Sequence, residues 1–210
     1  KRFVNYFAGL EMATVTTTVD SLASVAADTS NSGTLNITSG ELATSSFASV
    51  VGYSTINVTS NAAHSIQLPT SILSSTTGTI TMSFTSTIGV IVDGSALSGT
   101  ALKLNVTTGA ADDSITGAPD GDTVSAGDGN DTISGGAGAG ADLIYGNAGV
   151  DSIIGGMGAD SLYGGVDGDL LFGNRGDDFL VGGTGSDTLF GGQDDDMLLG
   201  GGESDLIRAG

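Results

Sequence analysis

The sequence of 210 residues contains no cysteine, one histidine and only five lysine or arginine residues. The absence of cysteine excludes disulfide bonds and thiolate metal sites. With 24 acidic residues the formal net charge is −19, which argues against nucleic acid and anionic membrane surfaces as partners, because both repel a polyanion. No apolar run reaches the roughly 18 residues that span a bilayer, and no signal-peptide pattern opens the chain. Cations are therefore the expected partners, and we expect no membrane insertion.

Catalytic groups are also scarce. His64 is the only histidine; it lies in an alternating run without neighbouring acids and is interpreted as a sheet residue rather than a base. The chain has neither an H-E-x-x-H motif nor a G-x-S-x-G nucleophile elbow, the patterns typical of zinc hydrolases and α/β-hydrolases. The sequence therefore predicts that this chain is not an enzyme.

The negative charge is concentrated in the C-terminal half. Residues 1–107 carry five acids and three bases, a net charge of −2, whereas residues 108–210 carry nineteen acids and two bases, a net charge of −17. This change of composition predicts two regions, a Ser/Thr-rich β region at 1–107 and a glycine- and aspartate-rich region at 108–210.

A nine-residue repeat runs through the C-terminal region. Its aspartates are Asp113, Asp122, Asp131, Asp142, Asp151, Asp160, Asp169, Asp178, Asp187, Asp196 and Asp205. They are nine residues apart, except for one step of eleven before Asp142, and an aliphatic residue follows each of them two places later. Self-similarity at a short fixed period is the signature of a solenoid.

Each unit reads G-G-x-G-x-D-x-U-x, where U is aliphatic. Glycines at the first, second and fourth positions permit positive φ and a tight turn with exposed carbonyls. The last three positions alternate outward, inward and outward, as in a three-residue strand whose middle side chain alone is buried. Two units would make one flattened coil, so the eleven units predict about five coils, with two parallel sheets and the U residues between them.

Stacking would place each sixth-position aspartate above the one 18 residues earlier. Carboxylates at a strand spacing of about 4.8 Å repel one another strongly unless something intervenes. Calcium suits this position, because it takes roughly six to eight hard oxygen ligands and glycine-rich turns offer carboxylates together with main-chain carbonyls. Without the ions, self-repulsion and glycine entropy should keep the region unfolded, so we expect folding to be coupled to Ca²⁺ binding.

The cleanest copies of the unit are GGMGADSLY at 155–163 and GGTGSDTLF at 182–190. Through this nonapeptide, residues 108–210 resemble the RTX family, the hemolysin-type calcium-binding repeats. The resemblance implies a parallel β-roll in which calcium ions lie between successive turns and the aspartates are shared along the stack. The turn pairs on the two sides of the roll predict about eight or nine ions, whose positive charge would nearly balance the −17 of this half.

The candidate metal ligands are the eleven sixth-position aspartates. Two of them stand in irregular units, since Asp113 follows a segment that lacks most glycines and Asp142 follows a turn with two extra residues. Asp120, Asp167 and Asp194 replace the fourth-position glycine, as Glu203 does in the last unit. These three aspartates are interpreted either as additional ligands or as solvated turn residues.

Residues 1–107 have no strict repeat but are rich in Ser, Thr, Val and Ile. Short alternating runs predict strands at 34–38, 54–59, 64–68, 79–84, 89–92 and 101–106. They could build a sandwich or an irregular parallel β-solenoid, and the solenoid is favoured because the last runs lead into the first nonapeptide without a linker. For residues 1–30 two predictions remain, a helix at FVNYFAGLEMATV and a strand at TVTTTV. The whole chain is predicted to be all-β, a parallel β-roll preceded by this β region.

Two functions of different class remain. Residues 92–117 are similar in style to RTX-bearing bacterial surface-layer proteins, in which Ser/Thr-rich β-coils lead into glycine-aspartate repeats. This resemblance implies an extracellular structural protein that assembles with copies of itself into a layer or filament at the cell surface. The alternative is a C-terminal export and folding module of a larger type I-secreted enzyme, toxin or adhesin, which folds on meeting calcium outside the cell.

Large apolar residues are predicted on both outer faces of the roll. One face carries Leu143, Tyr145, Tyr163, Phe179, Val181, Met197 and Leu199, and the other carries Ile154, Leu170, Phe172, Phe190 and Leu206. The two rows are interpreted as lateral contact surfaces. The alternative is that they are covered by a neighbouring domain or are the normal exterior of a roll. Ice binding by the turns is rejected, because the third turn position has no regular Thr/Asn array.

Overall fold

The computed structural model describes residues 79–85, 87–97 and 101–210 completely, and the backbone of residues 14–17, 33–39, 53–60, 65–67 and 77–78. All regular secondary structure in these parts of the chain is β-strand. Neighbouring strands of each sheet pair in parallel. The described residues include no helix long and apolar enough to cross a bilayer. The predicted all-β class is confirmed.

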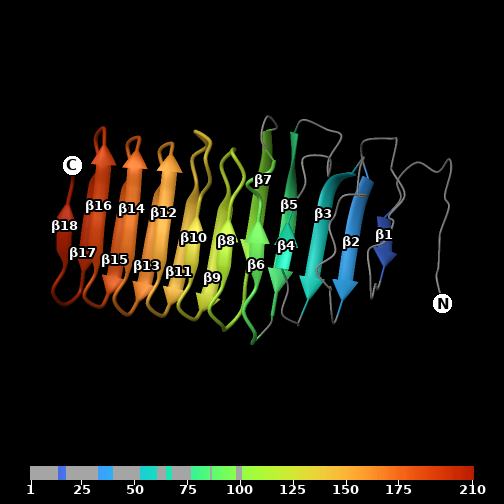
Figure 1. Cartoon of the computed structure of the whole chain (residues 1–210), viewed down its shortest axis with the longest axis horizontal. Coiled ribbons are helices and arrows are strands. Elements are labelled where there is room, and N and C mark those ends of the chain that lie inside the picture. Colours follow the sequence, from blue (N-terminus) through green and yellow to red (C-terminus); the bar gives the residue numbers. More distant parts are fainter. Residues whose placement is uncertain are drawn as a thin grey trace.

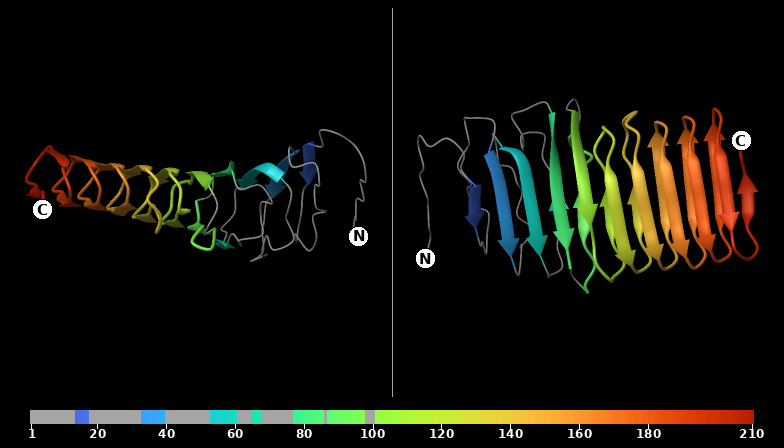
Figure 2. Two further views of the ribbon diagram at one scale, coloured as in Figure 1. Left: turned by 90° about the horizontal axis from the view of Figure 1, so that it is seen from above. Right: turned by 180° about the vertical axis from the view of Figure 1, so that it is seen from behind.

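From β3 onward the chain alternates between two sheets (Figure 1). The ten-stranded sheet contains, in spatial order, β1 (Thr14–Thr17), β2 (Gly33–Ser39), β3 (Tyr53–Ser60), β5 (Thr77–Phe84), β7 (Ala101–Thr107), β9 (Thr123–Asp128), β11 (Leu143–Ala148), β13 (Ser161–Val166), β15 (Phe179–Thr184) and β17 (Met197–Gly201). The eight-stranded sheet contains β4 (Ser65–Gln67), β6 (Ile91–Asp93), β8 (Ser114–Thr116), β10 (Thr132–Ser134), β12 (Ser152–Met157), β14 (Leu170–Arg175), β16 (Thr188–Gln193) and β18 (Leu206–Arg208). Seen from above, the sheets lie as two layers along the long axis (Figure 2).

The nonapeptide accounts for the coils of the C-terminal half. Each unit supplies one strand from β8 to β18, and strands two units apart pair in register, as Leu162 does with Leu180. The aliphatic residues from Ile115 to Leu189 are at most 1% exposed and form the core between the sheets, where each stabilises the fold by about 1.5–3 kcal/mol. In the last coil, which has a neighbour on one side only, Leu198 is partly buried and Ile207 is 45% exposed.

The Ser/Thr-rich region continues the same two sheets. Its six predicted strands correspond to β2 to β7, and β3, β5 and β7 pair in parallel. Both sheets then cross into the nonapeptides, through Val106↔Val124 in one and Val92↔Ile115 in the other. The solenoid interpretation is therefore confirmed over the sandwich for the described strands. The strand predicted at TVTTTV is β1, whereas the alternative helix covers residues 3–15, which lie outside the described residues apart from the last two, Thr14 and Val15.

Most strands of the roll are longer than the three residues that the repeat predicts, a length that only β8, β10 and β18 keep. β13, for example, extends into the turn because its glycines stay paired, with Gly165↔Gly183 and Val166↔Thr184 in register. Parallel main-chain bonding therefore continues through the third position of the next unit, and the chain reverses only after it.

The two extra residues before Asp142 are absorbed in the turn at 135–142. On either side of this turn the core residues keep their register, since Val124 pairs with Ile144 and Ile133 pairs with Ile153. A slip by one residue would turn the aliphatic side chains outward, so burial of this row fixes the register and leaves the insertion to the turn.

Candidate calcium-binding turns

The regular turns are left-handed at two places. In the unit that begins at Gly155, the second and fourth positions, Gly156 and Gly158, have φ of 125° and 136°. Where such positions are not glycine they hold Asn147, Asn174, Asp167, Asp194 and Glu203, again with positive φ. Asn and Asp tolerate this conformation better than other residues with a side chain. The turn shape thus survives the departures from the consensus.

The sixth-position aspartates form a hydrogen-bonded ladder along each row of turns. In one row the main-chain N–H of Asp151 donates to Oδ1 of Asp169 (2.9 Å), and the N–H of Asp169 donates to Oδ1 of Asp187 (2.8 Å). In the other row, the N–H of Asp160 donates to Oδ1 of Asp178 (2.8 Å). Each aspartate therefore lies on the next, as the period predicts, and one oxygen of each carboxylate is held by the backbone of the preceding coil.

The second carboxylate oxygen is left without a partner in most of these residues. Buried Oδ2 atoms with no hydrogen bond belong to Asp113, Asp131, Asp151, Asp160, Asp169, Asp178, Asp187 and Asp196. Leaving a buried polar group unpaired costs about 1–3 kcal/mol, and more for a charged one. Eight such atoms in two stacked rows are suited to a positively charged partner.

These unpaired oxygens border a space above the first glycine of their own unit. A β-carbon built on Gly164 would lie 2.7 Å from the carbonyl oxygen of Gly182, one coil further on, and closer still to Oδ2 of Asp169. Gly146, Gly173 and Gly182 are bordered in the same way by an aspartate Oδ2 and a glycine carbonyl. Carboxylate and carbonyl oxygens are the ligands that calcium prefers, so the residues present fit this ion.

Main-chain carbonyls would have to supply many of the ligands. Among the described residues, no group of three or more His, Cys, Asp or Glu side chains gathers as a metal centre. Each turn instead offers one sixth-position carboxylate together with the carbonyls of its glycine-rich segment, which suits the flexible oxygen coordination of calcium.

Burial raises the pKa of these carboxyl groups. Desolvation raises the pKa of Asp142 to about 8, and those of Asp131 and Asp169 to about 7, with neighbouring carboxylates adding to the effect. The main-chain N–H bond to each carboxylate acts in the opposite direction. At neutral pH a metal-free row therefore disfavours full ionisation, whereas a divalent cation would favour it.

The residues at the ends of the repeat fall into different settings. Asp113 is 4% exposed with an unpaired Oδ2, although its unit lacks most glycines. Asp205 is partly exposed, and its Oδ1 accepts the N–H of Asp187 (3.0 Å). Asp122 differs from both, because its two oxygens each accept a main-chain N–H. Sequence spacing alone does not distinguish these three residues.

The fourth-position acids lie in more open surroundings. Asp167 and Asp194 are exposed, and Asp120 is partly buried with its Oδ1 accepting the N–H of Gly121 (3.0 Å). This contrast with the buried sixth position favours their interpretation as solvated turn residues.

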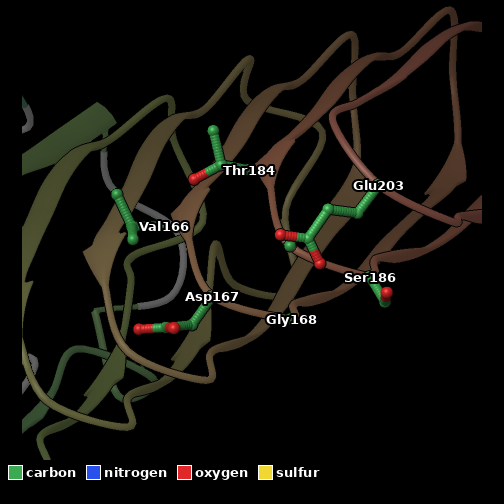
Figure 3. A pocket seen from close by; sticks show the side chains of 7 residues that line it. Val166, Asp167, Gly168, Thr184, Ser186 and Glu203 are labelled. Carbon is green, nitrogen blue, oxygen red and sulfur yellow. The ribbon is translucent and has the colours of Figure 1, made fainter.

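Asp167 borders a shallow surface hollow of about 410 Å³ (Figure 3). The hollow is lined by Val166, Asp167, Gly168, Thr184, Gly185, Ser186 and Glu203. Its two acids come from turns two coils apart, and the small residues of the intervening turn, Gly185 and Ser186, leave the space between them.

A second ladder, which the nine-residue period did not predict, occupies the fifth position of several turns. The N–H of Asn130 donates to Oδ1 of Asp112 (2.8 Å), and the N–H of Val150 donates to Oδ1 of Asn130 (2.8 Å). In the other row the N–H of Asp195 donates to Oδ1 of Asp177 (3.0 Å). The signal was the recurrence of Asp or Asn after 18 residues, which the sixth-position aspartates overshadowed.

The fold and the turns together define a class of protein, a parallel β-solenoid with two rows of buried carboxylates arranged for hard cations. The family model of the RTX calcium-binding nonapeptide repeat (4 copies) matches residues 107–140, 137–171 and 172–207. This match supports the RTX family, whose repeats bind calcium and are typical of secreted bacterial proteins. No curated protein and no solved structure matched the chain.

Proposed function

We propose that this protein is an extracellular, calcium-dependent structural protein of a bacterial cell surface, of the surface-layer or filament type, which folds and assembles on binding Ca²⁺. The proposed ligands are the sixth-position aspartates Asp113, Asp131, Asp142, Asp151, Asp160, Asp169, Asp178, Asp187, Asp196 and Asp205, with glycine carbonyls. About eight or nine ions would bind. Bound calcium supplies the positive charge that lets stacked carboxylates stay ionised.

The observation that carries the structural role is the division of the roll into acidic turns and faces without acidic residues. The strands from β10 to β18 contain no acidic residue, so the negative charge of this half lies in the turns. Once the turns are neutralised, little electrostatic repulsion would oppose contact between the faces of two molecules.

Both faces carry aligned apolar side chains. Tyr145 stacks on Tyr163 with ring centroids 4.8 Å apart, and Phe179 meets Tyr163 edge to face at 5.9 Å. On the other face Phe172 stacks on Phe190 at 5.0 Å. These contacts order the rows into flat strips, which support their interpretation as lateral contact surfaces.

The proposal is tested on the full chain after calcium has been removed. We expect added Ca²⁺ to raise the β signal in circular dichroism and to produce ordered layers or filaments in electron micrographs. A double variant, Tyr163→Ser with Phe172→Ser, should keep the calcium-dependent β signal and lose the assemblies. A β signal that a chelator leaves unchanged contradicts the calcium part of the proposal.

The alternative is an export and folding module of a larger secreted protein. It is supported by the occurrence of RTX repeats in secreted bacterial proteins. The same experiment separates the two, because a chain that folds with Ca²⁺ and remains monomeric contradicts the assembly role and favours the module.

A further inference from the structure

We infer that the turn at residues 117–122 is a calcium-independent joint, in which Asp122 fastens the roll to the Ser/Thr-rich coils instead of binding an ion. The inference rests on the proposed function, since it assigns the boundary of the calcium-binding rows. It removes one aspartate from the set that the repeat predicts as ligands.

The first ground is the hydrogen bonding of Asp122. Its Oδ1 accepts the N–H of Leu104 in β7, and its Oδ2 accepts the N–H of Ala118 in its own turn, both at 2.6 Å. The equivalent Oδ2 of Asp160, in the same row of turns, is buried without any partner. Both oxygens of Asp122 are therefore paired with backbone donors, so this carboxylate lacks the unpaired oxygen that its equivalents offer to an ion.

The second ground is the conformation of this turn. Positive φ angles occur in the units that begin at Gly155 and Gly164, but residues 117–122 have none. Ala118 stands at the second position and precedes Pro119, and a residue before proline is pushed towards extended φ and ψ. The turn therefore does not reproduce the left-handed pair of positions that the regular turns share.

The third ground is the turn that stacks on it. The lengthened turn at 135–142 has one left-handed position, Gly136 with φ of 126°, and neither Gly138 nor Gly140 has a positive φ. The two turns stacked at the joint therefore both lack the two left-handed positions of a regular turn. In this row the calcium-binding stack would begin between Asp142 and Asp160.

A consequence for folding follows from the position of the joint. Asp122 ties the first coil of the roll to β7, whose side chains alternate between exposed and buried in a core without repeated acids. The junction would therefore stay formed without Ca²⁺ and offer a folded edge on which the metal-dependent coils stack. The coils at the junction would then act as a folding nucleus that forms without calcium, and calcium binding would add the remaining coils to it.

The test compares two matched variants of the full chain, Asp122→Asn and Asp160→Asn. Bound calcium ions are counted by native mass spectrometry and by calorimetric titration. We expect Asp160→Asn to bind fewer ions than the unmodified chain, and Asp122→Asn to bind the same number. A lower count in Asp122→Asn, equal to that in Asp160→Asn, would overturn the inference.

The failure of the proposed function looks different in this experiment. If neither variant lowers the number of bound calcium ions, the sixth-position aspartates are not the ligands, and the proposed function is contradicted. A second measurement needs no variant: amide exchange by nuclear magnetic resonance in the calcium-free chain. We expect the Leu104 and Ala118 amides to remain protected while that of Asp160 exchanges freely; equal exchange at all three would also overturn the joint.

Discussion

The sixth-position aspartate of each regular turn has two oxygens with different surroundings. In Asp169, Oδ1 accepts the N–H of Asp151 and so holds the side chain in the stack, while Oδ2 is buried without a partner. The short side chain matters, because it reaches back over Gly164 of its own unit. Substitution by asparagine would keep an acceptor for the backbone and remove the charge, which separates the metal-binding role from the stacking role.

At this scale the first glycine of the unit can be tested directly. Gly164→Ala would place a methyl group against Oδ2 of Asp169 and the carbonyl of Gly182, in the space proposed for the ion. We expect weaker calcium binding and a loss of about 1–3 kcal/mol in the free energy of unfolding with calcium bound, typical of overpacking. Calcium titration and urea unfolding measure both quantities.

The matched control is Gly202→Ala. A β-carbon there would have its nearest neighbours at 3.9 Å, an ordinary contact, so affinity and stability should stay unchanged. Equal losses from the two substitutions would contradict the filling of the site as the cause.

The raised pKa values predict an inverted pH dependence for the metal-free chain. Burial raises the pKa of Asp131 and Asp169 to about 7 and that of Asp142 to about 8 in the folded state, against 3.8 in the unfolded chain. Their contribution to stability is therefore complete below about pH 4 and is lost as the pH rises towards about 7 to 8. We expect calcium-free protein to show more β signal at about pH 4 than at about pH 8.

Saturating calcium should reverse this order, because the ion binds the ionised carboxylates. Calcium is removed beforehand by dialysis, so that no chelator has to act at acid pH. Circular dichroism that is flat across this range without calcium would contradict the burial of uncompensated carboxylates.

At the scale of the element, the repeat predicted the positions of the strands better than their length or their turns. The aliphatic period placed β8 to β18, and alternation placed β2 to β7, because one buried side chain in two marks a strand with one face on a core. Spacing could not show that pairing continues through Gly165 and Val166. It could not show that Asp122 lacks an unpaired oxygen either, because that depends on the hydrogen bond from the Ala118 N–H to its Oδ2, which follows from the conformation of the turn and not from the spacing.

The left-handed turn positions give a second test. Asn174 takes the second position of its unit with φ of 80°, where asparagine is tolerated and alanine is strained. We expect Asn174→Ala to lower the free energy of unfolding with calcium bound by about 1–2 kcal/mol, measured by urea unfolding. Asn174→Gly should be neutral or slightly stabilising at this position, and an alanine variant as stable as the glycine one would contradict the strain.

At the scale of the whole molecule, one pair of continuous sheets joins two regions of very different charge. Residues 1–107 have a net charge of −2 and residues 108–210 a net charge of −17, while β7 pairs with β9 across the boundary. Hydrophobic burial runs along the whole described core, but electrostatic repulsion is confined to one end. Removal of calcium should therefore unfold the molecule from the C-terminal region and stop near the joint at 117–122.

Limited digestion with trypsin can detect this direction, because the chain has only five lysine or arginine residues. Arg175 ends β14 in the acidic region, and Lys103 lies within β7 beside the amide that Asp122 holds. In the calcium-free chain we expect fast cleavage after Arg175 and slow cleavage after Lys103, since a protease acts on the locally unfolded chain.

Calcium should slow cleavage at Arg175 by at least about tenfold, the factor that corresponds to about 1.4 kcal/mol of local stability. Mass spectrometry of the fragments identifies each cut. Asp122→Ala serves as the comparison, because it removes both acceptors of the joint and should speed cleavage after Lys103. Cleavage of the calcium-free chain at Lys103 as fast as at Arg175 would mean that the ions hold together both regions and that no metal-independent part exists.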